Sequence, residues 1–114
     1  MGYLHHAKYF EFFEMGRTEL LRQAGMRYRD LEREGILFVV FRDQVTYRRP
    51  ARYDDELTVC TSIDRVRHAS IDHRYEVRRD GLLLCEATST LACVDREGQP
   101  RGLPEALTQP LPTD

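Results

Sequence analysis

Two adjacent histidines, His5 and His6, stand directly before a segment that has the apolar spacing of a helix. The backbone N–H groups in the first turn of a helix have no partner within the helix, so they can bind an oxyanion. An imidazole at the same place can also accept a proton near neutral pH. The beginning of the chain therefore combines an oxyanion-binding position with a base.

The helix that must position these histidines is predicted from about His6 to Ala24. Apolar residues recur there at helical spacing, and Gly25 is a natural C-terminal stop. Further apolar residues widen this stripe, so we expect the helix to be buried over much of its girth. Gly16 in a helix interior costs roughly 1 kcal/mol against alanine. Close packing against a sheet or a ligand would explain that glycine.

The remainder of the sequence reads as a short helix followed by strands. The helix is predicted at 26–34, and strand patterns follow at 36–47, 57–63, 71–77 and 83–93. Asp80-Gly81 is a strong signal for a hairpin. We therefore predict a single α+β domain over 1–103, with the long helix on one face of an antiparallel sheet, and an irregular C-terminal tail at 104–114.

Composition excludes several classes of protein. The chain has 114 residues and a formal net charge of -2, so it lacks the basic excess typical of nucleic-acid binding. No apolar run approaches the roughly 18 residues that span a bilayer, and a secretory signal pattern is absent. The three cysteines are an odd number without a C-x-x-C pair. We expect them to be small buried side chains in a reducing compartment, which predicts a cytoplasmic protein.

An ordered series of motifs runs through the chain. The series comprises Gly-x-x-x-His-Ala-x-Tyr at 2–9, Glu-x-x-Arg-Thr-Glu-Leu-Leu at 14–21, Tyr-Arg-Arg-Pro-Ala-x-Tyr-Asp-Asp-Glu-Leu at 47–57, and Ser70 in a strand. It resembles the hotdog-fold acyl-CoA thioesterases, in particular the 4-hydroxybenzoyl-CoA thioesterase and YbgC-like branch. The resemblance covers nearly everything from Gly2 to about Leu103.

This resemblance implies a hotdog fold, in which a curved antiparallel sheet wraps around the long central helix. It implies a homodimer, often a dimer of dimers. The implied reaction hydrolyses an acyl-CoA thioester to the free acid and coenzyme A. No metal or separate cofactor is implied, because coenzyme A is part of the substrate. The two histidines also lack a third metal ligand at a suitable local spacing.

The resemblance also assigns catalytic residues. The N–H that polarises the acyl carbonyl falls on His6, Tyr9 matches the family tyrosine, and Glu14 is a reserve acid on the helix. The family's catalytic Asp would lie three positions before Gly2, and the family's first strand would also precede residue 1. We expect an N-terminally shortened chain rather than a true loss of the acid. A true loss would leave the alternative of a non-catalytic module that binds acyl-CoA or an acyl carrier.

Residues for binding substrate and coenzyme A are assigned by charge and by place in the pattern. Arginine suits bidentate phosphate contacts, and coenzyme A carries several phosphates. A corner between two strands resembles the CoA-facing segment of the family. The assigned residues are Gly2, His5, Arg49, Arg67, His68 and Ser70. An ordinary charged strand end remains the alternative for each single arginine. Four phenylalanines, Phe10, Phe13, Phe38 and Phe41, are expected in the core rather than in an acyl pocket.

Overall fold

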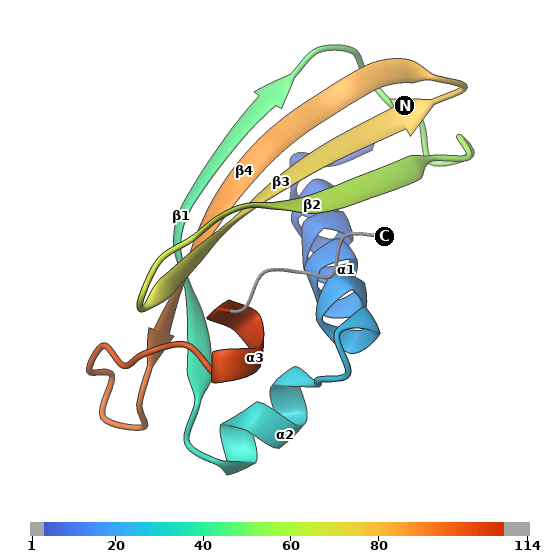
Figure 1. Cartoon of the computed structure of the whole chain (residues 1–114). Coiled ribbons are helices and arrows are strands. Elements are labelled where there is room, and N and C mark those ends of the chain that lie inside the picture. Colours follow the sequence, from blue (N-terminus) through green and yellow to red (C-terminus); the bar gives the residue numbers. More distant parts are fainter. Residues whose placement is uncertain (1–3, 109–114) are drawn as a thin grey trace.

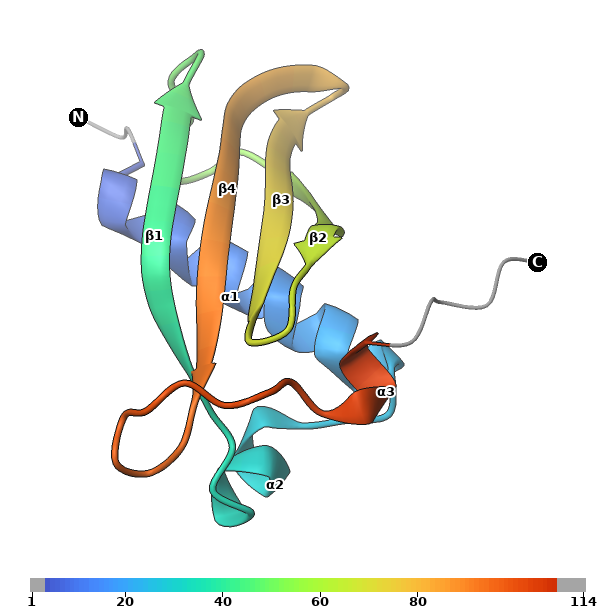
Figure 2. The ribbon, with the colours of Figure 1, turned by 60° about the vertical axis from the view of Figure 1, so that its left-hand side comes forward.

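The computed structural model describes residues 4–108 as a curved antiparallel sheet that wraps around one long helix (Figure 1). The helices are α1 (His6–Gln23), α2 (Tyr28–Arg33) and α3 (Glu105–Thr108). The strands are β1 (Leu37–Tyr47), β2 (Thr58–Val66), β3 (Ser70–Arg79) and β4 (Leu82–Val94), in the sheet order β1-β4-β3-β2. Figure 2 shows α1 crossing behind all four strands. The predicted α+β hotdog arrangement is confirmed.

Local backbone chemistry sets where the main elements end. Gly25 takes a φ of 83°, a left-handed conformation that suits glycine and ends α1 one turn after its last apolar contacts. Asp80 and Gly81 have φ values of 50° and 81°, as a two-residue hairpin turn requires. The predicted turn between β3 and β4 is therefore confirmed. It places the two strands side by side along most of their lengths.

The core lies between α1 and the inner face of the sheet, and it has two parts. Alternate residues of β3 and β4 point inward, as the period-two pattern predicts. The first part, which we call the Tyr75 cluster, consists of Tyr9, Phe13, Ala51, Tyr75, Val77, Leu84, Cys85 and Ala87. The second part, the Leu91 cluster, consists of Leu21, Leu31, Ile36, Ile71, Leu91, Cys93 and Leu103.

Buried polar groups lie among these core residues. Tyr75 and Ser89 share a hydrogen bond of 2.6 Å between their hydroxyl groups. His73 is buried, and its Nδ1 has no hydrogen-bond partner among the described residues. Burial is the main cause that lowers the pKa of His73 to about 4; the charge of the nearby Arg17 adds to this effect, and Asp72 opposes it more weakly. His73 is therefore a neutral core residue at neutral pH.

The predicted burial is wrong for three side chains. Phe10 is 42% exposed because it lies on the outer side of α1, of which only Tyr9, Phe13 and Leu21 are buried within the described chain. Phe41 is 76% exposed at an irregularity in the edge strand β1, where the register with β4 shifts. Cys60 is exposed on the other edge strand, β2, whereas Cys85 and Cys93 are buried as predicted.

Gly16 marks a close approach of α1 to the sheet. A Cβ atom at this position would overlap the Thr61 side chain of β2. The expected close packing against a sheet is therefore confirmed. The interior glycine lets the helix approach this edge strand more closely than any other residue would allow.

The end of the described chain differs from the expected irregular tail. Residues 105–108 form the short helix α3, in which the Leu107 N–H donates to the Pro104 carbonyl at 2.9 Å. Leu103 is buried and Leu107 packs against the Leu91 cluster, so two leucines four residues apart attach this segment to the core. Within the described residues, no helix has the length and apolar character to cross a membrane. Residues 109–114 of the predicted tail lie outside the described part.

Candidate active site

A cavity of about 320 Å³ lies where the beginning of α1 meets the end of β1. It is lined by residues from three segments of the chain: Leu4, His6, Tyr9, Tyr47, Arg48, Arg49, Pro50 and Ala51. Figure 2 shows the first turn of α1 beside the upper half of β1. Two of the predicted catalytic residues, His6 and Tyr9, and one predicted CoA-binding residue, Arg49, therefore share a cavity.

The first turn of α1 is uncapped. His5 precedes the helix in an extended conformation, with φ of -69° and ψ of 145°, and its side chain makes no capping hydrogen bond. The Leu4 N–H donates to the Ala51 carbonyl at 2.7 Å, which ties the approach to the helix to the segment after β1. The first turn also lacks an acidic residue. Its positive dipole end is thus available to an anionic or polarised oxygen in the cavity.

The His6 ring stacks on the ring of Tyr47. The ring centroids lie 3.9 Å apart and the planes differ by 12°. Tyr47 in turn meets Tyr9 edge to face, at 5.3 Å and 71°. Tyr9 is only 2% exposed, and burial raises the pKa of its hydroxyl above the usual value. The aromatic contacts therefore run from the core through Tyr9 and Tyr47 to the exposed imidazole.

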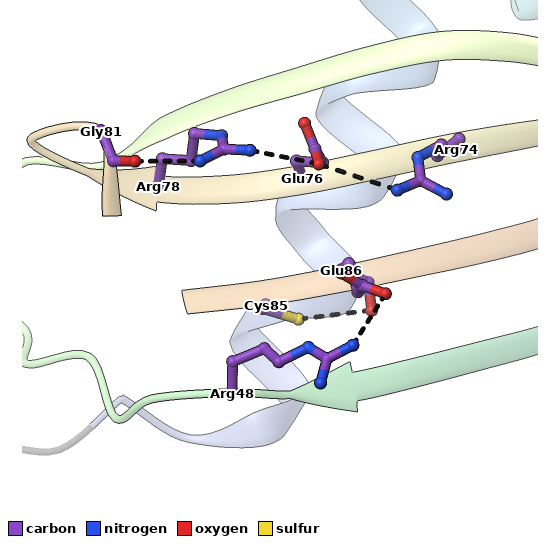
Figure 3. A network of polar contacts seen from close by, with 7 residues as sticks. All are labelled: Arg48, Arg74, Glu76, Arg78, Gly81, Cys85 and Glu86. Carbon is purple, nitrogen blue, oxygen red and sulfur yellow. Dashed lines mark hydrogen bonds and ion pairs between the residues drawn. The ribbon is translucent and has the colours of Figure 1, made fainter. Parts of the chain in front are cut away.

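Two neighbouring arginines at this cavity have different surroundings. The Arg48 guanidinium pairs with Glu86 of β4 at 3.2 Å (Figure 3). Glu86 lies opposite Glu76 of β3, which in turn pairs with further arginines of that strand. Arg49 makes no ion pair within the described residues, although its backbone N–H donates to Leu84 at 3.1 Å. Arg49 is thus the cation that remains available to a ligand.

The other predicted residues near the N-terminus have separate positions. His5 is exposed directly before α1. Glu14 lines a different cavity of about 160 Å³ between α1, α2 and β1, together with Arg17 and Tyr28. Glu14 is eight positions along the helix from His6, which is roughly 12 Å along the axis. The structure does not bring these two groups together within one chain. Gly2 lies outside the described residues.

The remaining predicted residues lie at the opposite end of the sheet. Arg67 donates to Asp72 at 2.8 Å, and this pairing lowers the pKa of the Asp72 carboxyl. The His68 carbonyl accepts the Leu103 N–H at 2.9 Å. Ser70 begins β3, opposite Ala92 of β4. Tyr47 of the cavity lies opposite Cys85 of β4, which is seven positions before Ala92. Seven positions along a strand span roughly 23 Å, so this corner is remote from the His6 cavity in the same chain.

Tyr47 lines the cavity and contacts His6, although the sequence pattern does not single it out as a site residue. It appears in the motif series only as the start of the Tyr-Arg-Arg-Pro segment. Nothing in its spacing indicates that the end of one strand would meet the first residue of a helix far earlier in the chain. As for metal ions, residues 4–108 contain no group of three His, Cys, Asp or Glu side chains that could hold one.

Comparison with known proteins adds to this geometry. The family model described as "Thioesterase superfamily" matches residues 1–86. The chain is 37% identical over 108 residues to the acyl-CoA thioester hydrolase YbgC of Escherichia coli, covering 93% of this chain and 81% of that protein.

Two solved structures are similar to this chain over most of its length. A probable thioesterase from Bartonella henselae has a TM-score of 0.84 at 35% identity, covering 90% of this chain and 86% of that one. A thioesterase from Thermus thermophilus, solved in complex with coenzyme A and Zn, has a TM-score of 0.78 at 26% identity. That likeness covers 93% of this chain and 81% of the Thermus chain.

Proposed function

Since the chain belongs to the thioesterase superfamily, we propose that it hydrolyses acyl-CoA thioesters to a free acid and coenzyme A. The observation that carries this proposal is the cavity at the uncapped first turn of α1, which His6 and Arg49 both line. That cavity offers a donor for the thioester carbonyl, a base and a free cation. These are the groups that hydrolysis of a phosphate-bearing thioester needs.

In the proposed reaction, the thioester carbonyl oxygen lies at the first turn of α1 and accepts a hydrogen bond from the His6 backbone N–H. Negative charge develops on this oxygen as water attacks the carbonyl carbon, and the helix dipole stabilises that charge. The His6 imidazole accepts the proton of the attacking water. The C–S bond then breaks, and the imidazolium returns this proton to the leaving sulfur, so that coenzyme A departs as the free thiol. The Tyr9 hydroxyl helps to position the carbonyl.

Two carboxylates could take part in this reaction together with the His6 imidazole. The family pattern places a carboxylate before Gly2, and such a group would attack the carbonyl or activate the water alongside the imidazole. Glu14 is the reserve acid of the proposal. Because Glu14 lines the cavity between α1 and α2, it cannot reach a thioester held at His6 of the same chain, and it would act as an acid only across a subunit interface.

We propose that the pantetheine and phosphate part of coenzyme A leaves the cavity past Arg49 and His5. The predicted contact of Gly2 with coenzyme A concerns a residue outside the described part of the chain. The free guanidinium of Arg49 supports this direction, since arginine binds phosphate oxygens in a bidentate manner. Arg67, His68 and Ser70 form a second contact region of the proposal. Their distance from His6 within one chain means that they would serve an active site only across a subunit interface.

We propose a homodimer formed through the edge of β1, with a dimer of dimers as the higher assembly. An edge strand that exposes apolar residues is a template for pairing with another chain. Val39, Val40 and Phe41 of β1 are 47%, 47% and 76% exposed. Antiparallel pairing of two β1 strands about their centres would bring the far end of the partner's sheet to the level of this cavity. In that arrangement, Arg49 of one subunit and the Arg67–Ser70 corner of the other could contact the same molecule of coenzyme A.

No metal or separate cofactor takes part in the proposed reaction, and we place the protein in the cytoplasm. Three free cysteines are consistent with a reducing compartment.

The proposal is tested by measuring release of free thiol from short-chain, long-chain and aromatic acyl-CoAs with the complete gene product and dithiobis(nitrobenzoate). Release from at least one class, saturable in substrate, is expected. No release from any class would contradict hydrolysis. Saturable binding of acyl-CoA without release would identify the module as a binding protein instead.

A further inference from the structure

The contact between His6 and Tyr47 joins two rigid elements. His6 is the first residue of α1 and Tyr47 is the last residue of β1. Tyr47 lies opposite Cys85 of β4 in the sheet, and the next N–H, that of Arg48, donates to Leu84 at 2.8 Å. The backbone of Tyr47 is therefore fixed by the sheet, and its ring provides a fixed plane beside the start of the helix.

The imidazole has no other support within the described chain. His6 is exposed, it makes no side-chain hydrogen bond or ion pair there, and its one ring contact is the stack on Tyr47. An unsupported side chain at the first position of a helix would sample several rotamers. With the two planes 12° apart and the centroids 3.9 Å apart, the stack restricts the imidazole to orientations in which its plane is nearly parallel to the Tyr47 ring.

The Tyr47 ring is itself supported by a contact with the core. Its edge-to-face contact with Tyr9 ties it to a side chain that is 2% exposed and packs against Phe13 in the Tyr75 cluster. Groups that take part in a reaction need support of this kind, because a displacement of about 1 Å costs up to roughly a hundredfold in rate. The core of the protein thus supports the imidazole through two aromatic rings.

We propose that Tyr47 is the positioning residue for His6: its ring fixes the plane of the imidazole so that a ring nitrogen faces the bound thioester. The phenol oxygen has no part in this role, which belongs to the face of the ring. Tyr47 touches His6 and acts through it. This inference rests on the proposed function, because it assigns a role in the same reaction at the same site.

The test compares wild-type protein with Tyr47→Phe, Tyr47→Leu and Tyr47→Met by nuclear magnetic resonance and by steady-state kinetics. In wild type and Tyr47→Phe, the His6 ring protons should resonate upfield because of the facing ring. They should move downfield in both aliphatic variants. The kcat for acyl-CoA should fall about tenfold to a hundredfold in the aliphatic variants with KM little changed, and Tyr47→Phe should retain it. Tyr53→Leu, which removes an exposed tyrosine outside the cavity, is the matched control.

Two aliphatic variants are used so that poor folding of one leaves the other for measurement. An aliphatic variant that loses the ring-current shift but keeps wild-type kcat would overturn the inference. Equal His6 shifts in wild type and aliphatic variants would overturn it as well, because the stack would then be absent in solution. If wild type releases no thiol from any acyl-CoA, the proposed function fails and Tyr47 has no reaction to serve. The resonance data, which need no substrate, still report the stack in that case.

Discussion

Gly16 of α1 lies so close to Thr61 of β2 that a methyl group on residue 16 would occupy the place of the threonine hydroxyl. Thr61 Oγ1 is buried there and has no hydrogen-bond partner among the described residues. Glycine is unfavourable in a helix interior, but the close contact with Thr61 leaves no room for a larger side chain at position 16. This contact fixes how closely the middle of α1 lies against the sheet.

Replacing Gly16 with alanine should destabilise the protein. Helix propensity alone would favour alanine by roughly 1 kcal/mol, whereas overpacking against Thr61 costs about 1–3 kcal/mol. The free energy of unfolding, measured in urea, should fall in Gly16→Ala and recover in Gly16→Ala/Thr61→Ala. Thr61→Ala alone is the control, and it should change little because the hydroxyl has no partner among the described residues. A more stable Gly16→Ala protein would contradict the close contact.

His73 should make stability depend on pH in mild acid. Its pKa in the folded protein is about 4, against an ordinary 6.5, so between these values the unfolded chain binds a proton that the folded protein does not. The free energy of unfolding should therefore decrease as pH falls from 6.5 to 4, by up to about 3 kcal/mol. Above pH 6.5 this contribution should be constant. Urea titrations at several pH values measure it.

The variant His73→Phe keeps an aromatic ring and removes the titration, so its stability should vary less over the same pH range. His68→Gln removes an exposed histidine and serves as the control, which should keep the wild-type dependence. If His73→Phe loses stability with pH as steeply as wild type, His73 is not the group responsible.

His6→Ala separates the two parts that residue 6 plays in the proposed reaction. The variant keeps the backbone N–H and removes the imidazole. Loss of a general base reduces rates by about 10² to 10⁴, so kcat should fall within this range while KM for the acyl-CoA stays near its wild-type value. His5→Ala is the matched control: it should keep the wild-type kcat, and any change should appear in KM, because His5 is a proposed contact of coenzyme A. Equal losses in both variants would contradict the assignment to His6.

Arg49 and Arg48 should differ in their effects on substrate binding. Removal of a charge-assisted hydrogen bond costs about 1.5–3 kcal/mol, so Arg49→Ala should raise KM for acyl-CoA about tenfold or more. Arg48→Ala should leave KM nearly unchanged, since its guanidinium is paired with Glu86. Steady-state kinetics and competition by free coenzyme A measure both. A larger effect of Arg48→Ala would reverse the proposed assignment.

Phe41→Lys should weaken the proposed dimer. A lysine on an edge strand opposes pairing, and Phe41 is the most exposed large apolar residue of β1. Sedimentation at several protein concentrations should show dimers for wild type and monomers for the variant. Leu82→Lys, a substitution at a partly exposed leucine beside the β3–β4 turn, should remain dimeric. A dimeric Phe41→Lys protein would place the interface elsewhere.

The sequence predicts those features that depend on local spacing. Asp80-Gly81 fixes a turn through its own backbone, and alternation along β3 and β4 identifies the inner face without knowledge of the partner strands. Burial of Phe41 and Cys60 is not predictable in the same way, because it depends on which strands become the edges of the sheet.

The same distinction holds for the candidate site. His6 and Tyr9 belong to one helical turn and are predicted together. Tyr47 is brought to them by the path of β1 across the sheet, and only the three-dimensional structure reveals that contact. Arg48 and Arg49 are neighbours of the same type in the sequence, and the position of Glu86 on β4 distinguishes them.

The exposure of Cys60 has a practical consequence for the thiol-release assay. Burial raises the pKa of Cys85 to about 11 and also raises that of Cys93, so both thiols react slowly with disulfide reagents. Cys60 on β2 is open to dithiobis(nitrobenzoate), the same compound that detects coenzyme A. Each mole of protein thus contributes close to one mole of rapid colour that is independent of acyl-CoA. Cys60→Ser lowers this blank, so that slow turnover by weak variants becomes measurable.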